Sequence, residues 1–141
     1  MKAILTSLQF VLLLFSLGFA QVIKVPQDMG AIQDALNAAS AGDSVMVLPG
    51  TYYENLIWPN IQGITLLSEA GPDSTIIDGS SAANVILINT GVDTTTKIRG
   101  FSIKNGYTAS FGAGIYCSNN SSPIIENNYI FENTSDSLGG G

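Results

Sequence analysis

The chain has 141 residues, a formal net charge of −6 and a charged fraction of only 11%. It contains one cysteine and no histidine. This composition excludes a basic nucleic-acid-binding protein, a framework of disulfide bonds and a zinc site of the CxxC type. For this stretch of chain it also excludes the histidine-dependent nucleophilic mechanisms. We expect one domain, with no catalytic residue and no bound cofactor or metal ion.

The first 20 residues resemble a targeting segment. Lys2 precedes an apolar run over residues 10–17, and small residues follow at Gly18 and Ala20, directly before Gln21. This pattern predicts a secretory signal peptide over residues 1–20, cleaved near Ala20. The alternative is an uncleaved anchor, but the run is shorter than the about 20 residues that span a bilayer. We therefore expect a secreted or cell-surface protein with no membrane span after cleavage.

One helix is predicted, over residues 30–41, within an N-terminal cap formed by residues 21–43. Apolar side chains recur there at helical spacing. These side chains are Ile32, Ala35, Leu36 and Ala39. Asp28 is the expected N-cap and Gly42 the expected C-terminal stop.

From Ser44 onward, apolar runs of three to five residues alternate with turn residues, which predicts many short strands. The runs also repeat at an offset of 27 residues. At that offset Ile88 meets Ile115, Ile98 meets Ile125, and Ile103 meets Ile130. A repeat of this length with three short strands predicts a chain that coils on itself, so that equivalent strands stack about 4.8 Å apart.

We therefore expect an all-β solenoid in which residues 44–141 form about three coils of roughly 27 residues. The predicted helix would cap its first coil. The alternative fold is a β-sandwich, whose strands would be longer and would lack a fixed period. Gly139-Gly140-Gly141 matches residues 112–114, which precede a predicted strand. The last coil is thus expected to be truncated at the C-terminus.

Several segments resemble the pectin-lyase-like right-handed parallel β-helix proteins. They are residues 31–39, residues 42–55, Thr75-Ile76-Ile77-Asp78-Gly79, residues 112–117 and Ser122-Pro123-Ile124-Ile125. The resemblance implies a right-handed parallel β-helix with an N-terminal capping helix, over about residues 24–141. It implies no single activity, because the fold hosts lyases, hydrolases, esterases and non-catalytic surface proteins. The opening is also similar to that of pectin esterases, whose catalytic motifs this chain lacks.

The candidate binding residues form a polar column. Asp78, Asn105 and Glu132 stand 27 residues apart, at one corner of successive predicted coils. Such a column could hold a calcium ion or a sugar hydroxyl, although three side chains in a line do not converge on one point. The alternative is an exposed turn. At the same offset Arg99 and Glu126 are expected to form an ion pair on the outer surface rather than a lyase-type site.

Aromatic residues and the cysteine give two further expectations. Tyr107 and Tyr116 are the best candidates for stacking on sugar rings, if they point outward. The aromatic residues of the first coil are expected to seal its contact with the cap; these are Tyr52, Tyr53 and Trp58. Cys117 is expected to face inward as a small buried side chain.

Two functions remain open. The first is a secreted, non-catalytic β-helix module that binds glycans or serves as an adhesive surface, with polysaccharide as its partner. The second is the N-terminal part of a polysaccharide-acting enzyme whose catalytic coils lie beyond residue 141. The predicted coils carry no clustered acidic residues, which favours the first.

Overall fold

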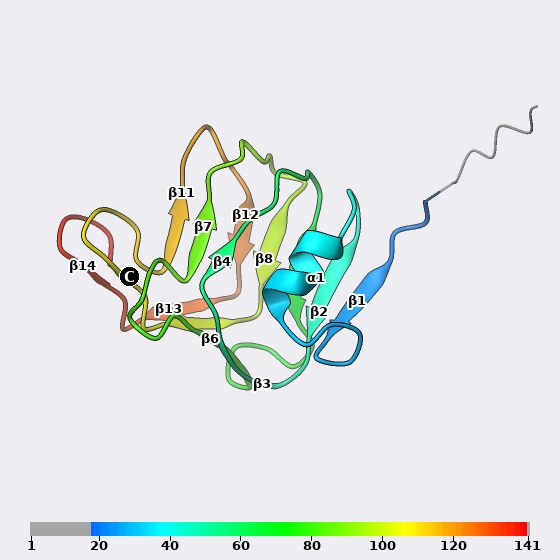
Figure 1. The fold of residues 1–141 in the computed structure, drawn as a ribbon, viewed down its shortest axis with the longest axis horizontal. Helices are drawn as coiled ribbons and strands as arrows, with labels where there is room; N and C mark the ends of the chain where they lie inside the picture. The colour runs from blue at the N-terminus through cyan, green and yellow to red at the C-terminus, as the bar shows by residue number, and fades with distance from the viewer. Residues whose placement is uncertain (1–17, 141) are drawn as a thin grey trace, which may run out of the picture.

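The structure, a computed structural model, describes residues 18–140 and is an all-β protein of parallel sheets with one helix (Figure 1). Most of the predicted signal peptide, residues 1–17, lies outside the described residues. Gly18, Phe19 and Ala20 are exposed and precede the first strand. No helix within residues 18–140 has the length and apolar character needed to cross a membrane.

Three parallel sheets contain most of the strands. The first sheet has the order β1 (Val22–Val25), β2 (Ser44–Val47), β5 (Thr65–Ser68), β8 (Lys97–Arg99) and β12 (Ile124–Glu126). The second has the order β3 (Gly50–Tyr53), β6 (Thr75–Asp78), β9 (Ser102–Lys104) and β13 (Tyr129–Phe131). The third has the order β4 (Leu56–Ile57), β7 (Ile86–Ile88) and β11 (Ile115–Cys117). A fourth, two-stranded sheet pairs β10 (Tyr107–Thr108) with β14 (Thr134–Ser135).

From β2 onward, consecutive strands of the chain lie in different sheets. Strands β2, β3 and β4 pass through the first, second and third sheet, and β5, β6 and β7 repeat this order. Strands β8, β9 and β11 follow, and β12 and β13 begin the next passage. We call each passage a circuit. Since every pairing between circuits is parallel, each circuit lies directly on the one before it.

Two of the three predicted isoleucine pairs are confirmed. Ile98 pairs with Ile125 and Ile103 with Ile130, both at an offset of 27. The third pair is wrong, because Ile88 lies opposite Cys117 while Ile115 lies opposite Ile86. The loop over residues 89–96 is two residues longer than the loop over residues 118–123. The strands after these loops therefore keep the 27-residue offset, whereas the strands before them pair at 29.

The core lies between the three sheets and is built from inward columns of apolar side chains. In the second sheet the column runs through Tyr52, Ile77, Ile103 and Ile130. Ile77 and Ile103 are fully buried, whereas Ile130 in the last circuit is 38% exposed. Alternate residues along a strand point to opposite faces, so the residues flanking this column point outward.

The helix α1 (Ile32–Ala38) is shorter than the predicted 30–41, but all four residues of its predicted apolar face are buried. It packs against β1, β2 and β4 at one end of the molecule, on the right in Figure 1. A seven-residue helix is not stable alone, so burial of this face holds it in place. Its C-terminus forms where Ala39 turns to an extended backbone conformation, and Gly42 lies in the turn beyond.

Asp28 is not the N-cap. Its carboxylate instead accepts a hydrogen bond from the Lys24 backbone N–H, at 2.7 Å. The helix N-terminus is capped from the first circuit by Glu54, whose two carboxylate oxygens accept from the N–H groups of Ile32 and Gln33 at 2.8 and 2.9 Å. A carboxylate is favoured there because the free N–H groups give that end a partial positive charge.

The side chain of Gln33 also covers the edge of β4 at this end. Its carboxamide donates to the Ile57 carbonyl at 3.0 Å and accepts from the Ile57 N–H at 2.7 Å. One amide side chain thus pairs with the edge of β4 as a neighbouring strand would. The opposite edge, at β11, β12 and β13, has no such cover among the described residues, and its apolar residues are exposed. These include Ile125 at 39%, Ile130 at 38% and Phe131 at 39%.

Candidate functional site

The structure brings two residues of the predicted column into contact. The Asn105 side chain donates to one carboxylate oxygen of Asp78 at 2.7 Å, and the Ser80 N–H donates to the other at 2.9 Å. Asp78 is only 7% exposed. Both carboxylate oxygens therefore already have partners within the protein.

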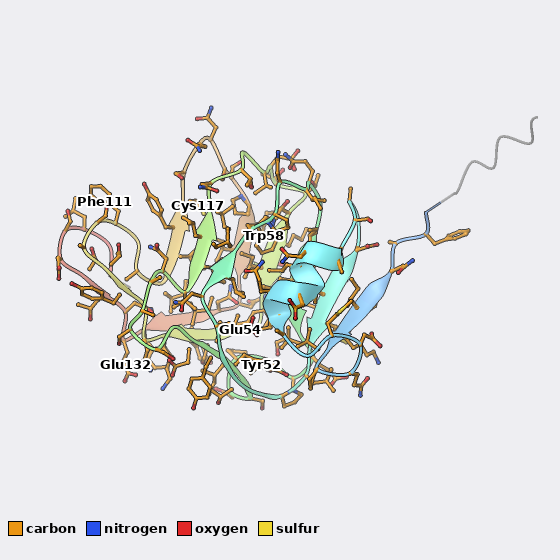
Figure 2. The ribbon with its side chains drawn as sticks, viewed as in Figure 1. Tyr52, Glu54, Trp58, Phe111, Cys117 and Glu132 are labelled. Atoms are coloured by element: carbon orange, nitrogen blue, oxygen red, sulfur yellow. The ribbon has the colours of Figure 1, made fainter. Side chains whose placement is uncertain are left out.

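Glu132 stands above Asn105 but its side chain turns elsewhere. The Asn105 N–H donates to the Glu132 carbonyl at 3.2 Å, and both residues have φ of 55°. The Glu132 carboxylate lies 3.9 Å from the Lys104 ammonium, and its side chain is 63% exposed (Figure 2). Within residues 18–140, no three acidic or cysteine side chains are grouped so that they could hold a metal ion. The three residues of the column thus form a stacked corner whose hydrogen bonds hold the backbone turn, and the carboxylate of Glu132 is exposed.

Arg99 and Glu126 lie opposite each other on β8 and β12, as predicted. The predicted ion pair is wrong, because among the described residues the salt bridge joins Lys104 to Glu132 instead. The side chains of Arg99 and Glu126 are both exposed, so water solvates each of them and little free energy is lost without an ion pair.

The second sheet presents a distinct outward surface. Its strands place Tyr53, Asp78, Lys104 and Phe131 in one register column, and Tyr129 flanks this column on β13. Tyr53 is 72% exposed and Tyr129 is 53% exposed. We call Tyr53, Lys104, Tyr129 and Phe131 the aromatic face. Adjacent strands are about 4.8 Å apart, so the three register steps from Tyr53 to Phe131 span about 14 Å.

Charged groups lie beside the rings of this face. The Lys104 ammonium lies 6.0 Å from the centre of the Phe131 ring, at the limit of a cation–π contact. The same ammonium is 3.9 Å from Glu132, so one hydrogen-bond donor and one acceptor flank the ring. Flat apolar rings with polar groups at their rim can bind a ligand that has both apolar and hydroxyl-bearing faces.

The aromatic residues named from the sequence have different environments. The expected contact with the cap is confirmed for Tyr52, whose hydroxyl lies 3.4 Å from the Val25 carbonyl and donates to the Leu48 carbonyl at 2.9 Å. Trp58 is buried. The same expectation is wrong for Tyr53, which follows Tyr52 and therefore points outward. Tyr116 is only partly exposed.

Tyr107 is 38% exposed and donates its hydroxyl to Asp136 at 2.7 Å. This hydrogen bond and the negative charge of Asp136 raise the pKa of Tyr107. Lys104 and Phe131 were not candidates from the sequence. The 27-residue spacing between Lys104 and Phe131 is the signal that could have found them.

Cys117 has the inward register expected for it, opposite buried Ile88, but the expectation of burial is wrong. Cys117 (Figure 2) is exposed because β11 is the edge strand of the third sheet, with no strand on its outer side among residues 18–140. Desolvation nevertheless raises the pKa of its thiol. A thiol with a raised pKa is a weak nucleophile near neutral pH.

A second feature lies at the start of the described chain. A cavity of about 400 Å³ opens beside the turn that joins α1 to β2, and its lining includes Phe19, Gln21 and Asp43. Asp43 accepts the Gln21 N–H on one oxygen and the Ser40 N–H on the other, both at 2.8 Å. These two bonds lower the pKa of the Asp43 carboxyl against the opposing effect of burial.

Comparison with models of protein families gave no match to this chain, and comparison with curated proteins gave none either.

Proposed function

We propose that this chain is an exported right-handed parallel β-helix module that binds a neutral polysaccharide or cell-surface glycan on its aromatic face. The repeated passage through three parallel sheets supports the β-helix, and the strong preference of parallel crossovers for one hand supports the right-handed form. The signal-peptide pattern of residues 1–20 supports export and cleavage near Ala20.

The observation that carries the binding proposal is the exposure of three aromatic rings on one face of one sheet. Tyr53, Tyr129 and Phe131 are each more than one-third exposed, although burial of such side chains would stabilise the fold. The net charge of −6 disfavours acidic ligands and leaves neutral glycans as the matching class. Asp78, Asn105 and Glu132 border this face, and the exposed Glu132 carboxylate, whose Oε2 is paired with Lys104, can accept from a sugar hydroxyl through its other oxygen.

The test compares two variants in affinity electrophoresis against a panel of neutral polysaccharides. Tyr129→Ala with Phe131→Ala removes two rings of the aromatic face. Phe111→Ala removes a 44%-exposed ring outside this face and is the matched control. We expect the double variant to lose at least about tenfold in affinity, or about 1.4 kcal/mol, while the control binds like wild type.

Binding to none of the polysaccharides, or an equal loss in both variants, would contradict the proposal. Urea unfolding of both variants checks that the fold is retained. A second arm incubates the protein with pectin, polygalacturonate and alginate and measures unsaturated products by absorbance. Product formation would favour the alternative function, a polysaccharide-acting enzyme.

A further inference from the structure

The residue at which the predicted mature chain begins is held in place by its backbone. The cleavage pattern predicts that Gln21 becomes the first residue after removal of residues 1–20. Within residues 18–140, Gln21 is also the first residue whose backbone N–H and C=O both form hydrogen bonds. Its N–H donates to Asp43 at 2.8 Å, and its carbonyl accepts from the Ser44 N–H at 2.8 Å.

The Asp43 carboxylate is built to receive a cation at this position. It is only 7% exposed, and the Ser40 N–H fixes its second oxygen. Cleavage of the Ala20–Gln21 bond would replace the peptide N–H with an α-ammonium group, 2.8 Å from the same carboxylate oxygen. The adjoining cavity is lined in part by Gly18 and Phe19, which cleavage would remove, so the additional hydrogens have room.

Few other charges lie on the elements packed around this turn. Lys24 on β1 and Asp34 on α1 are the titratable side chains of β1, α1, β2 and β5. Neither contributes to the shift of the Asp43 pKa, which arises from the backbone N–H groups of Gln21 and Ser40. Asp43 is therefore the charged group that determines the protonation state of an α-amine at Gln21.

We propose that Asp43 is the binding site for the mature N-terminus and that its ion pair with the Gln21 α-ammonium protects this glutamine from cyclisation. The inference rests on the export and cleavage proposed above. An N-terminal glutamine cyclises when its neutral α-amine attacks the side-chain Cδ. The N–Cδ bond forms, the Cδ–Nε2 bond breaks, and ammonia leaves with a proton from the amine, with no oxidant required.

Protection follows because only the neutral amine is a nucleophile. An α-amino group ordinarily has a pKa of about 7.7–8.0, and a nearby carboxylate favours the protonated form. Each unit by which the pKa rises reduces the neutral fraction below that pKa about tenfold. The ion pair also holds the amine on Asp43, away from its own carboxamide, since charge-assisted hydrogen bonds are strong and directional.

The experiment secretes the full chain with its leader from an expression host and follows the intact mass of the purified protein at neutral pH. Wild type should begin at Gln21 and keep its amine. Asp43→Asn should lose the mass of one ammonia on the order of tenfold faster. Asp28→Asn is the matched control, because the Asp28 carboxylate also accepts a backbone N–H nearby but does not contact Gln21.

A comparison without a variant guards against misfolding of Asp43→Asn. Wild type unfolded in urea should cyclise on the order of tenfold faster than folded wild type at the same pH. Equal rates in folded and unfolded wild type, or a mature protein that is already cyclised on secretion, would overturn the inference while leaving export intact. Cleavage at another bond would also overturn it. Retention of residues 1–20 would instead refute the proposed export.

Discussion

Removal of the Glu54 carboxylate should weaken the attachment of the helix to the first circuit. In Glu54→Ala, the N–H groups of Ile32 and Gln33 lose acceptors at 2.8 and 2.9 Å. Loss of a helix N-cap costs about 0.5–2 kcal/mol, and loss of a negative charge at this end costs about 0.3–1 kcal/mol. We expect destabilisation by about 2 kcal/mol, which corresponds to a fall in Tm of roughly 6–10 °C for a chain of this size.

The assay for this variant is urea and thermal unfolding followed by Trp58 fluorescence. Trp58 is the only tryptophan, it is 1% exposed, and it directly follows β4, which contacts α1. Glu69→Ala is the matched control, because Glu69 is exposed and should change stability by less than about 0.5 kcal/mol. Equal stability of the two variants would refute the conclusion that Glu54 holds the capping helix in place.

Three further predictions concern other polar contacts. Asn133→Ala should cost about 2–3 kcal/mol in urea unfolding, because the Asn133 side chain bonds the backbone of Gly106 and Ile103 and is 8% exposed; exposed Asn60→Ala is the control. Glu132→Asn should stabilise the protein by about 0.5–1 kcal/mol, because asparagine tolerates the positive φ at this corner better and the exposed ion pair contributes little; a lower unfolding midpoint would contradict this. The pKa of Asp43 in the folded protein lies below the 3.8 of the unfolded chain. Its carboxylate therefore stabilises the fold above pH 3.8, and this contribution is lost as the pH falls through the folded pKa. The difference in unfolding free energy between wild type and Asp43→Asn should shrink over that range.

The sequence predicted those features that depend on local pattern. The apolar face of α1 and the short strands follow from spacing that a single segment carries. The 27-residue repeat gave the correct partners for β8 with β12 and for β9 with β13. It failed at Ile88, because a loop that is two residues longer changes the register without changing the pattern of the strands.

The cap of α1 could not be predicted from the sequence, because the residue that caps the helix is distant from it in the chain. Glu54 is 22 residues from Ile32, and nothing in the sequence distinguishes it from the other acidic residues that could cap a helix. Cys117 shows the same limit in another way. Its alternation with Ile115 correctly gave its direction, but its exposure depends on whether another strand lies above it.

The contact of the Gln33 side chain with β4 also has a consequence for the order in which the two ends of the molecule fold. Because it satisfies both hydrogen-bonding groups of Ile57, the edge of β4 at the α1 end needs no further strand, and α1 precedes the circuits in the chain. Each completed circuit then offers strand edges with which the next circuit can pair, whereas the edge of β4 is already occupied by Gln33. Assembly of the chain should therefore be vectorial, proceeding from α1 toward β13. Amide hydrogen exchange should record this as protection that decreases along the first sheet from β5 through β8 to β12, the last strand of that sheet to join.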